Sequence, residues 1–166
     1  MRLDFEGLVT DFHAINDWTV GDHNAEHESD LAWLNSNVAE VEQKEPQREI
    51  IIFSYHSPTV LREANDPVHK ESEVSSAFVS NLCEERCWTS PSVKLWVWGH
   101  THFNCDFGDE DTGNRCVANQ KGYGVGERFD FDGTKVVGIS GEIQDVKRAK
   151  SCFSPVVSDD GHLTMR

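Results

Sequence analysis

The spacing of hydrophobic residues changes along the chain and divides it into predicted helices and strands. Between residues 24 and 43 the apolar positions recur at steps of three and four among acidic residues, which predicts an amphipathic helix. Ser29 is one possible N-cap of this helix. The apolar run 50–53 is β-branched and aromatic and predicts a strand covered on both faces, and the run 93–98 predicts a second strand that Gly99 ends.

Two kinds of segment are predicted between these strands. Residues 62–73 are rich in charged and turn-forming residues, and we expect a long surface loop there. Residues 74–87 predict a second helix that buries Ala77, Phe78 and Leu82 on one side. The first half of the chain is therefore expected to alternate between strands and helices, as α/β folds do.

Shorter apolar segments in the second half predict mainly antiparallel structure. Two hairpins are expected, with strands over 104–107 and 115–119 and over 129–131 and 135–138. Combined with the first half, they predict an α/β chain with mixed sheets, in one domain over residues 1–140. Residues 141–166 show no clear period, and this tail receives no assignment.

The net negative charge of the chain limits which classes of partner it can bind. The chain has 166 residues, with 15 Lys and Arg against 29 Asp and Glu, which gives a net charge of −14 with neutral histidines. Because such a surface repels phosphate, we expect no nucleic-acid partner, and an anionic substrate would need a bridging cation. No apolar run is long enough to cross a bilayer or to form a signal peptide, so we expect no membrane partner and take a cytoplasmic protein as the default.

The cysteines and tryptophans carry less information. Five cysteines without a C-x-x-C pair are interpreted as buried thiols in a reducing compartment, although Cys105 and Cys116 could face each other across the first hairpin. The five tryptophans are interpreted as core and sheet-face residues.

The strongest candidate chemistry lies directly after the two predicted strands. Gly99-His100-Thr101-His102 follows the strand at 93–98, and His56 follows the strand at 50–53. Two histidines separated by one residue direct their rings into one pocket if the residue between them is nearly extended. Imidazole is a common metal ligand, and the ends of central strands are where α/β folds place their sites. We therefore expect His56, His100 and His102 to bind metal.

These residues resemble motifs of the calcineurin-like metallophosphoesterase family. Gly99-His100-Thr101-His102 is similar to its G-H-x-H motif, and residues 50–58 are similar to the strand and histidine loop before it. The likeness is greatest to fungal members and spans roughly residues 11–123. It implies an α/β/β/α sandwich and hydrolysis of phosphoesters with two divalent ions, whether Mn, Zn or Fe. His102 would bind the first ion, and His100 would bind the second together with His56 or its neighbour.

The sequence departs from the family pattern at two places. The expected histidine of H-x-x-P falls at Tyr55, so His56 stands one residue late. Of the family's first three motifs, D-x-H and G-D are imitated at residues 11–13 and 21–22 with spacing too short for a helix and a strand, and G-N-H-D/E is absent from the chain. We therefore expect only the C-terminal half of the sandwich.

Electrostatics limits what such a half can bind. Because neutral imidazoles leave the repulsion between two dications uncompensated, we expect at most one weakly held ion and weak or no hydrolysis by the chain. The alternative function is a catalytically inactive remnant that acts as a binding module. An uncovered sheet edge would then favour self-association.

Overall fold

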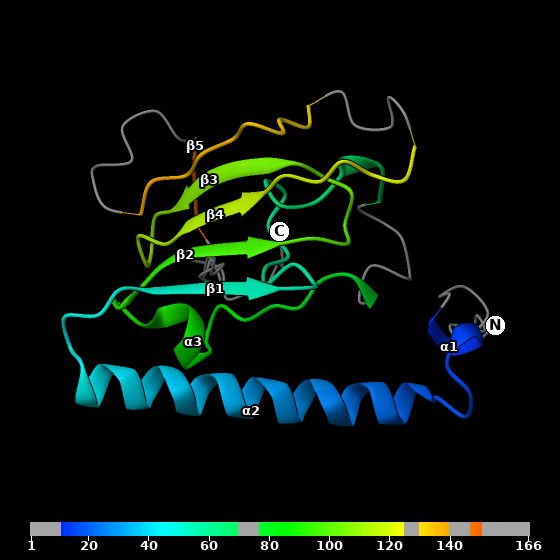
Figure 1. The fold of residues 1–166 in the computed structure, drawn as a ribbon, viewed down its shortest axis with the longest axis horizontal. Coiled ribbons are helices and arrows are strands. Elements are labelled where there is room, and N and C mark those ends of the chain that lie inside the picture. Colours follow the sequence, from blue (N-terminus) through cyan, green and yellow to red (C-terminus); the bar gives the residue numbers. More distant parts are fainter. Residues whose placement is uncertain (1–10, 70–76, 125–129, 140–146, 151–166) are drawn as a thin grey trace, which may run out of the picture.

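The computed structural model describes residues 11–69, 77–124, 130–139 and 147–150. One mixed sheet of five strands dominates this part of the chain, in the order β1-β2-β4-β3-β5 (Figure 1). The strands are β1 (Ile50–Ser54), β2 (Val93–Trp98), β3 (Cys105–Asp109), β4 (Arg115–Ala118) and β5 (Lys147–Ala149). The α/β class and the mixed sheet are confirmed.

The long helix α2 (Val20–Lys44) runs beside β1 (Figure 1), and the shorter helical elements are α1 (Asp11–Ala14), η2 (Pro67–His69) and α3 (Arg86–Thr89). The helix predicted at 24–43 is thus confirmed but begins earlier. Thr19 is the N-cap, and its side chain accepts from the backbone N–H of Asp22 while the Asp22 carboxylate accepts from the backbone N–H of Thr19. The possible cap at Ser29 is wrong, because this residue lies within the helix.

Burial differs sharply between the two parallel strands β1 and β2. Leu95 and Trp96 point to opposite faces of β2 and both are at least 95% buried, as expected for a central strand. In β1, Ile52 is buried but Phe53 is 75% exposed. The prediction that the strand at 50–53 is covered on both faces is therefore wrong, because β1 is an edge strand among the described strands and only one of its faces contacts the core.

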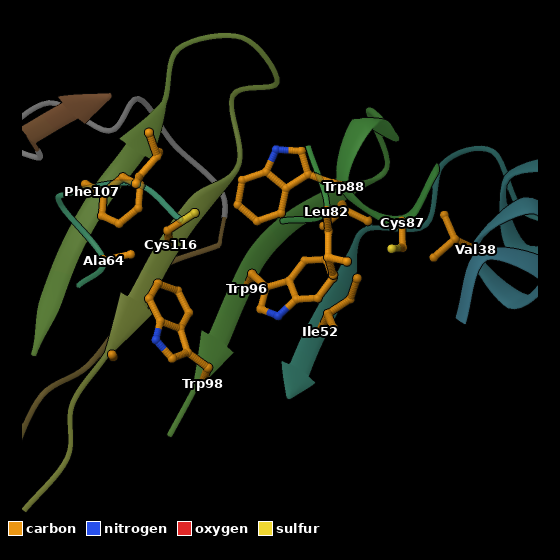
Figure 2. Close-up of a cluster of buried hydrophobic side chains, with 13 residues drawn as sticks. Val38, Ile52, Ala64, Leu82, Cys87, Trp88, Trp96, Trp98, Phe107 and Cys116 are labelled. Atoms are coloured by element: carbon orange, nitrogen blue, oxygen red, sulfur yellow. The ribbon is translucent and has the colours of Figure 1, made fainter. Parts of the chain in front are cut away.

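An aromatic cluster forms the core between the sheet and the helices. Trp88 from α3 packs against Trp96, with ring centroids 5.5 Å apart, and Trp98 contacts Phe107 across the sheet (Figure 2). Val38 is the buried contact of α2, and Leu31 and Leu34 pack against the cluster from the same helix. Trp33 is 65% exposed, so its assignment to the core is wrong. Trp33 lies outside the stripe of α2 that packs against the core, which consists of Leu31, Leu34 and Val38.

The helix predicted at 74–87 is wrong over residues 78–85. There the backbone bonds mainly to the loop after β1: Ser57 N–H donates to the Phe78 carbonyl, and Leu82 N–H donates to the Pro58 carbonyl. Residues 70–76 lie outside the described part, Ala77 has 3-10 conformation, and α3 (Arg86–Thr89) is the α-helix of this segment. Ala77 and Leu82 are nevertheless buried.

The hairpin of β3 and β4 is confirmed, but the second predicted hairpin is wrong. Residues 130–131 and 135–138 form no strand, although Lys135 N–H closes a turn on the Asp132 carbonyl; residue 129 lies outside the described part. β4 pairs parallel with β2 and β5 pairs parallel with β3, so the C-terminal half is less antiparallel than predicted. β5 comes from the unassigned tail. Within the described part, no helix is long and apolar enough to cross a membrane.

Candidate functional site

The turn after β2 carries two of the three predicted ligands. His100 and His102 both have positive φ, 64° and 49°, and Thr101 N–H donates to the Gly99 carbonyl. A left-handed conformation costs a non-glycine residue about 1–2 kcal/mol, so surrounding contacts must hold this turn. The backbone between the two histidines is therefore not the extended one that we expected, and the two rings have different neighbours.

His100 is stacked between two aromatic rings. Its centroid lies 4.3 Å from that of Tyr55 and 4.5 Å from that of Phe78, with interplanar angles of 24° and 25°. Tyr55 directly follows β1, and Phe78 is positioned by the backbone bond from Ser57 N–H to its carbonyl. The elements at the carboxyl end of β1 thus fix the position of the His100 ring.

His56 reaches the same place. Its ring centroid lies 5.2 Å from that of His100, edge to face, and 5.1 Å from that of Tyr55. A shift of one residue along a continuous strand would turn His56 to the opposite face, but β1 ends at Ser54, and the chain bends at residues 55–56. Both Tyr55 and His56 therefore contact His100.

His102 lies in a different set of contacts. Its ring packs edge-on against Tyr123, with centroids 4.5 Å apart, and its backbone N–H donates to Oε1 of Gln120. Nε2 of the same Gln120 donates to the Thr101 hydroxyl at 3.0 Å. Gln120 therefore holds the strained turn, a role that sequence reasoning missed.

A further histidine, His23 of α2, was missed by the sequence pattern. Its ring centroid is 5.9 Å from that of His56 and 5.8 Å from that of Phe12. The capping box at Thr19 starts α2 and thereby places His23 in the first turns, next to the loop after β1. Nothing in the spacing of these histidines links residue 23 to residue 56, so only the tertiary structure reveals the contact.

The residues that imitate the family's first motifs have other roles or are not described. Asp22 is the capping-box residue of α2, and its hydrogen bonds with Thr19 lower the pKa of its carboxyl. The side chains of Asp11 and His13 lie outside the described part. The Gly21-Asp22 pair is thus a helix start, in agreement with its poor spacing as a metal motif.

The donor set can be compared with what a metal ion needs. A Zn–N bond of about 2 Å puts the ion about 3 Å from the ring centroid, so two imidazoles on one tetrahedral ion have centroids about 5 Å apart. The 5.2 Å between His56 and His100 matches this value. Within residues 11–69, 77–124, 130–139 and 147–150, no group of three or more His, Cys, Asp or Glu side chains could hold a metal ion. The spacing of the two rings is therefore compatible with one ion between them.

An apolar groove lies next to these histidines. It has a volume of about 450 Å³ and lies between α2 and β1, with Trp33 on one side and Phe53, Tyr55 and His56 on the other. Sequence reasoning missed the groove, because it took Trp33 and Phe53 as buried. Comparison of the chain with protein-family models, with curated proteins and with solved structures gives no match.

Proposed function

We propose that the chain is a metal-dependent phosphoesterase module in which His56 and His100 hold one divalent cation. The observation that carries the proposal is the 5.2 Å between their ring centroids, because the ends of two neighbouring parallel strands bring together residues 44 positions apart. His102 remains a third candidate ligand from the same turn. The resemblance to calcineurin-like metallophosphoesterases supplies the phosphoester as substrate and Mn, Zn or Fe as the ion.

In this proposal the side chains of the chain bind the cation and orient the histidine rings that hold it. A bound divalent cation supplies Lewis acidity toward a phosphoryl oxygen. Tyr55 and Phe78 keep the His100 ring from rotating, and Gln120 keeps the turn in its strained form. On a chain with a net charge of −14, the cation also offsets the repulsion of an anionic substrate.

The proposed activity is weak. Because no group of three or more His, Cys, Asp or Glu side chains in the described part could hold a metal ion, we expect this site to take one dication and not a pair. One ion polarises the phosphoryl group but does not clamp both the attacking and the leaving oxygen, as a metal pair does. Slow turnover of activated esters is therefore the expected result.

The test is metal affinity and hydrolysis measured on the same variants. Calorimetric titrations with Mn²⁺, Zn²⁺ and Fe²⁺ are compared with hydrolysis of p-nitrophenyl phosphate. We expect His56→Ala and His100→Ala each to weaken binding by at least about tenfold and to abolish turnover. His27→Ala, which changes a half-buried histidine one turn beyond His23 on α2, is the matched control. Equal affinity of the wild type and a variant lacking both proposed ligands would refute the site.

A second candidate function is a non-catalytic binding module. It is favoured by the exposure of the edge strand β1, where Phe53 is 75% exposed and the neighbouring Tyr55 is 60% exposed. Exposed edges with apolar side chains favour association with another chain. Sedimentation velocity distinguishes self-association from a monomer: a dimer that Phe53→Glu dissociates would support self-association through this edge, and a monomer at all concentrations would exclude it.

A further inference from the structure

We infer that the groove between α2 and β1 binds a small organic cation, of the quaternary-ammonium class, through aromatic faces. This inference does not rest on the proposed metal site, and its test involves no catalysis. The groove's volume of about 450 Å³ is in the range of small-molecule sites. Its walls come from two elements that the core holds rigidly, since Leu34 of α2 and Ile52 of β1 both pack against the hydrophobic cluster.

Three aromatic side chains line the groove and remain largely exposed. Trp33 is 65% exposed, Phe53 is 75% exposed, and Tyr55 is 60% exposed although its ring also stacks on His100. Exposed aromatic side chains that gather around one groove are unusual, and such apolar patches mark binding sites. Their π faces attract a cation positioned within about 6 Å of the ring centroid.

Charge favours a cation over a neutral apolar ligand. Asp30 lines the groove from the same side as Trp33, because residues three apart on a helix are neighbours. The net charge of −14 adds a long-range preference for positive ligands and disfavours anions.

Two serine hydroxyl groups in the groove already have partners, which leaves fewer groups that could recognise a ligand by hydrogen bonds. Ser54 donates to the His56 carbonyl and accepts from the Trp96 indole N–H. Ser57 donates to the Thr59 carbonyl. A quaternary ammonium needs no hydrogen-bond acceptor and carries its charge on methyl groups, so it suits a site that offers π faces and one carboxylate.

The test compares choline with 3,3-dimethylbutan-1-ol, its neutral isostere of nearly the same shape. Binding to the full chain is measured by calorimetry and by amide shifts in ¹H–¹⁵N NMR spectra. We expect choline to bind in the millimolar range and the isostere to bind at least about fivefold more weakly, which is the effect of one exposed cation–π contact. The shifted amides should lie along α2 and β1.

Substitutions that keep apolar surface but remove π faces provide the variants. Trp33→Leu and Phe53→Leu should each weaken choline binding by about threefold to fivefold. Phe131→Leu changes an exposed aromatic residue outside the groove and should leave the affinity unchanged. Circular dichroism verifies that each variant is folded, and both sites of substitution are exposed enough to tolerate the change.

Three results would overturn the inference. Equal affinity for choline and its isostere would show that the groove selects apolar shape and not charge. Unchanged choline binding in the Trp33→Leu, Phe53→Leu double variant would place the ligand elsewhere. A dimer whose interface covers the groove at all measurable concentrations would show that a second copy of the chain occupies it.

Discussion

The ion cluster around Asp106 is predicted to stabilise the β3–β4 hairpin and to attach the segment 130–139 to it. The Asp106 carboxylate accepts two hydrogen bonds at 2.9 Å from Nε and Nη2 of Arg115, and it lies 2.7 Å from Nζ of Lys135. The three side chains are 20–27% exposed, so water screens them only in part. We propose the substitution Asp106→Asn, which keeps the volume and removes the charge.

The expected loss follows from these contacts. A hydrogen bond to a charged group is worth about 1.5–3 kcal/mol when buried, and an exposed ion pair about 0.2–1 kcal/mol. Asparagine keeps one acceptor for Arg115 but loses the second bond and the attraction to Lys135. We therefore expect the free energy of unfolding to fall by about 2 kcal/mol in Asp106→Asn and by about 0.5–1 kcal/mol in Lys135→Met.

The pH dependence gives an independent check. Burial raises the pKa of Asp106, but the hydrogen bonds from Arg115 and Lys135 outweigh it and hold this pKa below its ordinary value of 3.8. The carboxylate's contribution is therefore complete at pH values well above 3.8 and is lost as the pH falls through the lower folded pKa. The difference in stability between the wild type and Asp106→Asn should shrink in that range.

Urea denaturation monitored by tryptophan fluorescence at pH 6.5 and at about pH 3 measures both effects, whereas guanidinium would screen the ion pairs. The matched control is Asp132→Asn, whose carboxylate is exposed and takes part in a local turn with Thr134. A difference between wild type and Asp106→Asn that stays constant down to pH 3, or no difference at pH 6.5, would refute the reasoning.

Three further predictions concern the cap, the thiols and the indole N–H. Thr19→Ala removes the capping box of α2 and should lower stability by about 1 kcal/mol, measured by urea denaturation, with Thr19→Ser as the conservative control. Burial raises the pKa of the Cys105 thiol to about 12 and that of Cys116 well above its ordinary value, so neither should react with a thiol reagent at pH 8 until urea is added; rapid labelling of the native chain would contradict this. Ser54→Ala removes the acceptor of the buried Trp96 indole N–H at 2.8 Å and should cost about 1–2 kcal/mol, whereas unchanged stability would show that another acceptor is available.

The elements that were predicted correctly are those in which the spacing of hydrophobic residues matches the face that packs against the core. The period of three and four residues identified α2, and the β-branched runs identified β1 and β2. The segment 77–85 has a helix-like spacing of apolar residues, yet its backbone groups bond to Ser57 and Pro58. Local spacing cannot indicate such a tertiary partner, and for the same reason it did not predict the three-residue strand β5.

The candidate site was predictable only to the level of strand ends. Neighbouring parallel strands necessarily bring their carboxyl ends to one edge, which is why His56 and His100 meet. The direction of each ring depends on the backbone of the turn, and a left-handed conformation at His100 and His102 is not encoded in a G-H-x-H pattern. The stacking partners of His100 and the approach of His23 therefore had to come from the structure.

Tyr55 takes part in both proposed sites, because it occupies the position where the motif has a histidine. In the family motif that residues 50–58 resemble, this position holds a histidine; in this chain the tyrosine ring stacks on His100, and the same side chain lines the groove beside Phe53. The bend after Ser54 lets His56 contact His100 as well. An irregular loop, unlike a strand, does not force successive side chains onto opposite faces. Although the histidine stands one residue later than in the motif, its ring therefore still pairs with His100, and Tyr55 forms an aromatic wall of the groove. Both proposed sites favour cations, which is consistent with a chain whose net charge is −14.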